Sequence, residues 1–76
     1  MNQDFYLIQV LEGLNSSVLQ KMSSPQNMML TDKMINFKLF ESEKEALAFV
    51  EGLKRTYKDN KNLKFRVVHG NLEVQI

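Results

Sequence analysis

Apolar residues recur at helical spacing in one segment of the chain. Ser42 precedes Glu45 by three residues, the capping-box spacing, in which each side chain satisfies a free backbone N–H at the start of a helix. The pattern predicts a helix over 43–58, ended by the polar run 59–62. Gly52 interrupts the helix, and we expect it to permit a close approach to a sheet. The apolar stripe of the helix consists of Ala46, Leu47, Phe49, Val50, Leu53 and Tyr57.

Alternation of apolar and polar residues after the helix predicts two strands. The segments 63–69 and 72–76 both alternate, and Gly70-Asn71 between them suits a two-residue turn at positive φ. Residues directly opposed in such a hairpin share a face, so all its apolar alternates fall on one side. The sequence therefore predicts a β-hairpin over 63–76.

Two further strands are expected before the helix. The segment 35–41 alternates and leads directly into Ser42, and the aromatic and β-branched run 5–11 reads as a strand, with a short helix as the alternative. The run 5–11 is apolar on both faces, so both faces should be covered. Residues 14–34 are the least decided: they form a short helix or a loop, and they either fold over the second face or leave it to another chain.

The predicted fold class is α+β. We expect a two-layer sandwich in which one main helix, 43–58, packs on a mostly antiparallel sheet of about four strands. The predicted element order is β–(short helix or loop)–β–α–β–β. A chain of 76 residues is expected to form a single α+β domain over 1–76, with 14–34 as its least ordered or covering segment.

Composition restricts where the protein works. The chain has no cysteine, which favours a reducing compartment, and its net charge is +1. No stretch approaches the roughly 18 apolar residues of a membrane span, and the first residues lack the basic start of a signal peptide. We therefore expect a complete, soluble, cytoplasmic chain without a membrane partner.

Residues that carry chemistry are scarce. His69 is the only histidine, and without cysteine a zinc site would need three carboxylates beside it. His69 is also the one conventional base for a nucleophile, at the expected end of the hairpin. The glycines are far apart, so they form no phosphate-binding loop. The sequence therefore predicts no catalytic residues, no metal, no cofactor and no enzyme activity. An enzyme subunit, which would need a polar pocket around His69, is the last of three hypotheses for function.

Charge is polarised along the chain. Residues 54–66 contain six basic residues against Asp59 alone, a balance of +5. This pattern indicates a basic face for a phosphate backbone or an acidic protein surface; the alternative is that cations simply favour the end of a helix and the solvent side of a strand. The candidate basic face consists of Lys54, Arg55, Lys58, Lys61, Lys64 and Arg66.

The chain also has more apolar residues than one helix can cover. Methionine-rich surfaces are adaptable and recur at binding sites. Phe40 and Val68 are expected to point away from the helix and to add to this surplus. The candidate apolar interface consists of Tyr6, Ile8, Val10, Met28, Met29 and Met34.

These features favour a small interaction protein that occupies a surface on another protein, as an adaptor or inhibitor. The alternative function is nucleic-acid binding through the basic face at 54–66. A homodimer through the candidate apolar interface is a further hypothesis. The size and charge pattern also suit an accessory protein of a phage or other mobile element.

Overall fold

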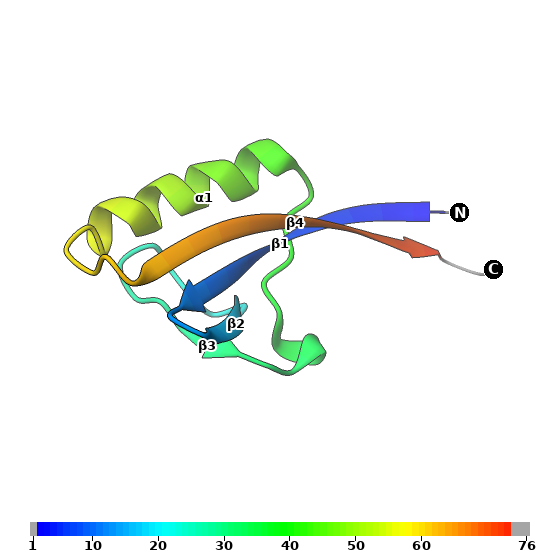
Figure 1. Ribbon diagram of the computed structural model, residues 1–76. Coiled ribbons are helices and arrows are strands. Elements are labelled where there is room, and N and C mark those ends of the chain that lie inside the picture. Colours follow the sequence, from blue (N-terminus) through cyan, green and yellow to red (C-terminus); the bar gives the residue numbers. More distant parts are fainter. Residues whose placement is uncertain (1, 74–76) are drawn as a thin grey trace.

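The computed structural model describes residues 2–73 and the side chains of residues 3–71. The sheet has the strand order β3-β2-β1-β4, with every neighbouring pair antiparallel, and α1 covers one of its faces (Figure 1). The predicted fold class, a four-stranded antiparallel sheet with one main helix, is confirmed. The elements are β1 (Asn2–Glu12), β2 (Asn15–Leu19), β3 (Leu30–Thr31), the 3-10 turn η1 (Met34–Asn36), α1 (Glu43–Thr56) and β4 (Leu63–Glu73).

Helix α1 begins where the capping pattern predicts. The backbone N–H of Glu45 donates to Ser42 Oγ at 3.2 Å, so the serine satisfies a donor that would otherwise lack a partner. At the other end Tyr57 donates its N–H to the carbonyl of Leu53 at 2.9 Å, and the helix ends at Thr56. The predicted helix is thus confirmed, two residues shorter than expected.

The predicted hairpin at 63–76 is wrong. Strand β4 continues through the expected turn: Gly70 pairs with Phe5 and Asn71 pairs with Asp4, within a ladder of eleven residue pairs between β1 and β4. This long ladder outweighs the local turn preference, because every pair adds to the sheet. Of the expected second strand 72–76, the first two residues continue β4 and 74–76 lie outside the described residues.

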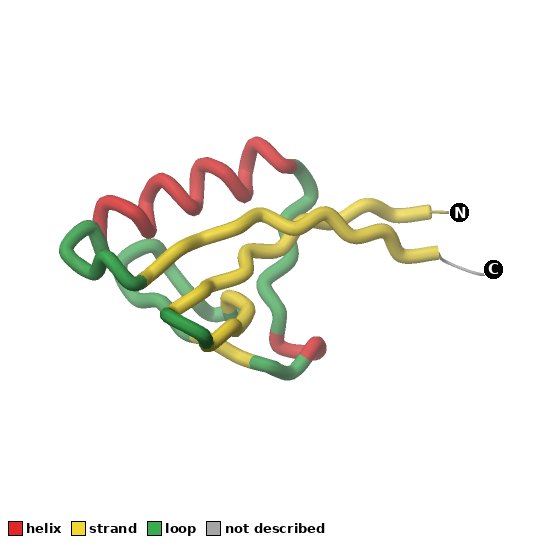
Figure 2. Tube along the Cα trace, in the orientation of Figure 1, coloured by secondary structure: helices red, strands yellow, loops and turns green. Residues whose placement is uncertain are grey.

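Residues 14–34 contribute strands instead of a short helix or a covering loop. Strands β1 and β2 are joined by a two-residue turn, Gly13-Leu14. Gly13, the first residue of this turn, has a φ of +60°, as in a type II′ turn. Strands β2 and β3 widen the sheet (Figure 2). This segment therefore does not form a layer over the second face.

The expected strand at 35–41 is replaced by η1 followed by an extended segment. That segment bridges to Gln20 at Phe37 and to Tyr6 at Phe40. Tyr6 and Phe40 exchange two backbone hydrogen bonds, with N–O distances of 2.9 and 2.8 Å. The segment thus pairs with the sheet only at isolated positions: Phe37 pairs just after the end of β2, and Phe40 pairs with the edge of β1 that β2 leaves open.

The core lies between α1 and the sheet face that carries Ile8 and Val10. Phe40 belongs to this core, where its ring meets that of Phe49 edge to face at 5.4 Å, so the expectation that Phe40 points away from the helix is wrong. Val68 pairs with Leu7 on the other face, as expected. The buried apolar residues are Ile8, Val10, Leu19, Phe40, Ala46, Val50 and Leu53.

Candidate functional site

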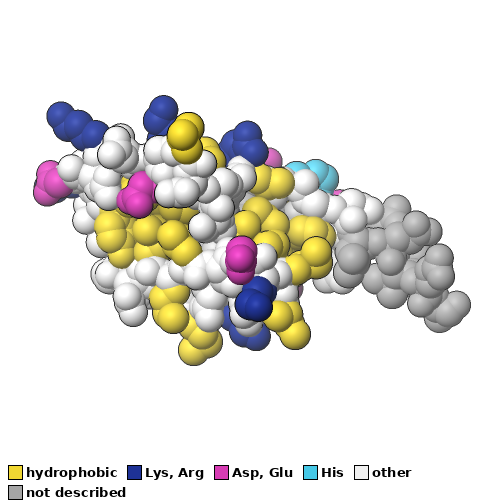
Figure 3. Space-filling view, turned by 60° about the horizontal axis from the view of Figure 1, so that its bottom comes forward, with side chains coloured by type: hydrophobic (Ala, Val, Ile, Leu, Met, Phe, Trp, Pro, Cys, Tyr) yellow, Lys and Arg dark blue, Asp and Glu magenta, His cyan; other side chains and the backbone are white. Residues whose placement is uncertain are grey.

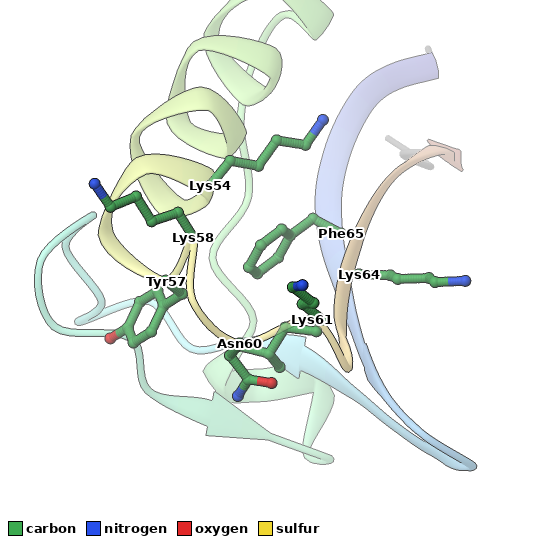
Figure 4. A pocket seen from close by; sticks show the side chains of 8 residues that line it. Lys54, Tyr57, Lys58, Asn60, Lys61, Lys64 and Phe65 are labelled. Atoms are coloured by element: carbon green, nitrogen blue, oxygen red, sulfur yellow. The ribbon is translucent and has the colours of Figure 1, made fainter.

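Four of the six candidate basic residues line one groove. The groove lies between the end of α1 and the start of β4 and has a volume of about 560 Å³ (Figure 4). Figure 4 shows their side chains spread around it, with that of Lys64 directed away from the helix. This region, which we call the basic groove, is lined by Lys54, Tyr57, Lys58, Asn60, Lys61, Leu63, Lys64 and Phe65.

The local sequence explains this convergence. Lys54 lies on α1 and Lys58 lies in the turn just after the helix, and Figure 4 shows their side chains directed to different sides. The chain then reverses through a turn in which the N–H of Leu63 donates to the carbonyl of Asn60 at 3.3 Å. Asn60 Oδ1 also accepts from the N–H of Asn62 at 3.2 Å. The turn brings Lys61 and the first residues of β4 back beside the helix. Asn60 was not among the predicted site residues, because an asparagine in a turn gives no sign that it lines a groove.

The remaining two basic residues lie elsewhere. Arg55 is exposed on α1 and lines neither this groove nor its neighbour, whereas Arg66 lines the neighbouring groove. Among the side chains of residues 3–71, none of the six candidates is within 4.0 Å of a carboxylate oxygen. The ammonium groups of the basic groove therefore create a positive potential that favours an anion.

A second groove continues the first along β4. It lies between α1 and the outer edge of β4, has a volume of about 400 Å³, and shares Lys54 and Phe65 with the basic groove. Its helix side combines acidic and apolar side chains. This α1–β4 groove is lined by Tyr6, Glu43, Leu47, Val50, Glu51, Lys54, Phe65, Arg66, Val67 and His69.

A polar cluster surrounds Asp4 near the end of the β1–β4 ribbon. The Asp4 carboxylate accepts from Asn71 Nδ2 at 2.7 Å and contacts His69 Nε2 at 3.1 Å. The hydrogen bond from Asn71, and after it the one from His69, lower the pKa of Asp4. The His69 ring stacks on Tyr6 with the ring centres 4.9 Å apart. His69 thus lies within a continuous strand, not at the tip of a hairpin, and the separation of 65 residues hid its contact with Asp4 from the sequence.

The candidate apolar interface does not form one exposed surface. Ile8 and Val10 are buried under α1, with 0% and 2% of their surface exposed, because the face of β1 that carries them is the face the helix covers. Tyr6 is half-buried under the His69 ring. Met28 packs against the core, and its N–H donates to the hydroxyl of Tyr57 at 2.9 Å. Of the six candidates, Met29 and Met34 are exposed, at 41% and 81%.

The exposed methionines lie in an apolar surface that includes residues the sequence did not single out. Backbone hydrogen bonds join its segments: Gln20 donates to Met29 at 2.8 Å, and Lys21 donates to Asn36 at 2.8 Å. Figure 3, which turns this part of the molecule towards the viewer, shows hydrophobic side chains at the surface in several places. We call this the β3–η1 surface; its exposed residues are Met22, Met29, Leu30, Met34 and Ile35.

The sheet face away from α1 is also apolar. The pairing of β1 with β4 and β2 places Phe5, Leu7, Leu11, Val18 and Val68 on this face. All five side chains are half-buried. The expectation that β1 is apolar on both faces is thus confirmed, while residues 14–34 leave the second face without a covering layer.

A comparison of the chain with protein-family models, with curated proteins and with solved structures found no match. In the described part of the chain, no group of three or more His, Cys, Asp and Glu residues is placed to hold a metal ion. No helix among the described residues is long and apolar enough to cross a membrane.

Proposed function

We propose that this chain is a non-enzymatic, cytoplasmic protein-binding module that acts as an adaptor or inhibitor. One observation carries the proposal: five large apolar side chains are exposed in the hydrogen-bonded segments of the β3–η1 surface, where the sequence neighbours Met34 and Ile35 are each 81% exposed. Exposed large apolar side chains that gather in one part of a protein are typical of protein interaction sites.

The local structure supports this role. Met34 and Ile35 lie in the three-residue turn η1, which presents them outward because so short a turn has no buried face of its own. Methionine side chains are flexible and adapt to the shape of a partner. The partner surface is therefore expected to be apolar at its centre.

Affinity capture with matched variants tests the proposal. The tagged protein, the double variant Met34→Glu with Ile35→Glu, and the control Leu14→Glu are incubated with host lysate treated with nuclease, and bound proteins are identified by mass spectrometry. Leu14 is fully exposed in the β1–β2 turn, so its variant carries a similar change outside the β3–η1 surface. We expect one stoichiometric protein that the double variant loses and the control retains. Capture that is equal in all three would reject the proposal.

The basic groove supports nucleic-acid binding as a second candidate function. Four lysines without a carboxylate partner among the described side chains surround a groove that also contains Tyr57 and Phe65. Backbone phosphates would bind the ammonium groups, and the aromatic rings would offer surfaces for a base.

Fluorescence anisotropy with a labelled single-stranded oligonucleotide tests this second function. We expect binding that weakens steeply with salt and is lost in the double variant Lys58→Glu with Lys61→Glu. The control Arg55→Glu removes a basic residue of the same segment that lies outside the groove, so it should lower the affinity much less. An equal loss of affinity in Arg55→Glu and in the double variant would show charge attraction without a site.

A further inference from the structure

The outer edge of β4 carries a regular row of backbone donors and acceptors. Tyr6 uses both its N–H and its C=O on Phe40, on the side of β1 opposite to β4. In an antiparallel ladder the partner of such a residue also directs its backbone groups away from the pair. His69, the partner of Tyr6, therefore directs its N–H and C=O outward, and Phe65 and Val67 do the same at every second position.

Nothing in the described part of the chain pairs with this edge. Strand β4 is the last in the sheet order, and its eleven residues run in an uninterrupted register with β1. Proteins commonly protect an exposed edge with a proline, a bulge or a very short strand. Strand β4 has none of these. Charged side chains can also protect an edge, and β4 has two, Lys64 and Arg66, on the sheet face away from the helix.

We propose that two copies of this chain associate edge to edge through β4, antiparallel and about a two-fold axis at Val67. Residue 65 of one copy would then face residue 69 of the other, and residue 63 would face residue 71. Such a ladder has about ten backbone hydrogen bonds. The proposal goes beyond the protein-binding function, because it uses a surface separate from the β3–η1 surface.

The helices support this arrangement. Helix α1 packs over β1 and β4, so in the dimer the two helices would lie two strand spacings apart, which is about 10 Å. That distance is within the usual range for two packed helices. Leu47, which is 47% exposed on the groove side of α1, would be buried between them.

The charges on the groove side of α1 complement themselves. Its N-terminal half carries Glu43, its middle carries Glu51, and its C-terminal half carries Lys54. When the two helices are antiparallel, Lys54 of each copy lies near Glu43 of the other copy. This self-complementarity favours a second copy over an unrelated peptide strand, which would bring no helix to cover Leu47.

The strands place no like charges directly opposite each other, and Arg66 lies only diagonally across from Arg66 of the second copy. About an axis at Val67, Arg66 faces Val68 of the second copy and Lys64 faces Gly70. Like charges directly opposite each other would destabilise the pairing, and this register avoids them.

Charge exchange tests the dimer. Sedimentation velocity over a range of concentrations should give a species of twice the 8.9 kDa chain mass for the native protein. Lys54→Glu and Glu43→Lys each alter two symmetry-related pairs, so each should weaken the dimer about fivefold or more. The double variant should restore the affinity to within about twofold. Because residues 43 and 54 lie at different ends of one helix, only contact between copies explains that restoration.

Amide hydrogen exchange gives a second readout. In the dimer, the amides of Phe65, Val67 and His69 should be protected, and this protection should disappear on dilution. Those of Arg66 and Val68 point towards β1 and should be protected at all concentrations. A protein that stays monomeric at millimolar concentration overturns the proposal. So does a dimer that the charge exchange does not restore, or one that is lost in Met34→Glu with Ile35→Glu, since that result places the contact on the β3–η1 surface.

Discussion

The phenyl ring of Phe5 lies over Gly70 on the neighbouring strand, where a Cβ atom would overlap the ring. The two residues are directly paired in the β1–β4 ladder. A glycine weakens a strand because it has no side chain to pack, and here the aromatic ring opposite fills that space. This pair explains how β4 passes through a Gly-Asn sequence that would suit a turn.

Gly70→Ala should destabilise the protein by about 1–3 kcal/mol, because the new methyl group displaces the Phe5 ring. In a Phe5→Ala background the ring is absent, and the same change should instead stabilise by about 0.5–1 kcal/mol, since alanine restricts the unfolded chain more than glycine. Urea unfolding of the four proteins measures both effects. An equal cost of Gly70→Ala in the two backgrounds would show that the ring does not occupy this space.

The Asp4 cluster makes stability depend on pH in the acid range. The pKa of Asp4 in the folded protein is below its ordinary value of 3.8, chiefly through the hydrogen bond from Asn71. Ionised Asp4 therefore stabilises the fold above that ordinary value, and the contribution is lost as the pH falls through the lowered pKa.

NMR titration of the Asp4 carboxyl group checks the cause of the shift. Asn71→Ala should raise the pKa of Asp4, because the hydrogen bond from Asn71 is the largest single cause of the lowered value, and His69→Ala should raise it as well. Asn62→Ala, at an exposed asparagine in the loop before β4, serves as the control and should leave the titration of Asp4 unchanged. A titration of Asp4 that Asn71→Ala does not move contradicts the assigned hydrogen bond.

Gly52 permits a close contact, but with a loop and not with the sheet as expected. A Cβ atom at this position would be 2.9 Å from Pro25 Cβ. Gly52→Ala should therefore destabilise the protein by about 1 kcal/mol, because the overlap outweighs the better helix propensity of alanine.

Pro25 provides the control for this prediction. In a Pro25→Gly background the overlapping atom is gone, and Gly52→Ala should stabilise by up to about 1 kcal/mol. Thermal unfolding of the four proteins in a double-mutant cycle gives the coupling between the two sites. A coupling near zero would mean that the loop moves aside without cost.

Two residues of the candidate apolar interface should differ in what they contribute. Ile8 is fully buried, so Ile8→Ala should cost about 2–5 kcal/mol of unfolding free energy through the lost contacts and the cavity. Met34 is 81% exposed, and Met34→Ala should change stability by less than about 0.5 kcal/mol. Chemical denaturation measures both. A large stability loss in Met34→Ala would indicate that Met34 is packed in the folded protein.

Elements fixed by neighbouring residues could be predicted from the sequence. The cap at Ser42 and the stripe of α1 depend on positions within a few residues, so the start of the helix and most of its buried face were correct, although Leu47 of the predicted stripe is exposed. The fold class followed, because a chain with one such helix and several alternating segments has few other two-layer solutions.

Pairing between distant residues could not be predicted in the same way. The chain remains extended at Gly70, where a turn was predicted, and turns instead at Gly13. The choice depends on Phe5, which is 65 positions away from Gly70. Strand β2 was missed because Ser16 and Ser17 break the apolar alternation that identifies a strand.

The candidate site was predictable only where it is local in sequence. The lysines of the basic groove are within eleven positions of one another, and their clustering was visible as charge. The β3–η1 surface combines three segments that backbone hydrogen bonds join, so the sequence indicated its methionines but not its extent. Ile8 and Val10 were assigned to the candidate apolar interface because the pattern of β1 does not reveal which apolar face the helix covers.

The pairing of the first strand with the last has a consequence for biosynthesis. Residue 2 pairs with residue 73, and β4 supplies Phe65 and Val67 to the packing beside α1. While the ribosome is still making the chain, β1 therefore lacks its main partner and the core lacks one wall. Contacts so distant in sequence slow folding, so the nascent protein should reach its final structure only after β4 has emerged from the exit tunnel.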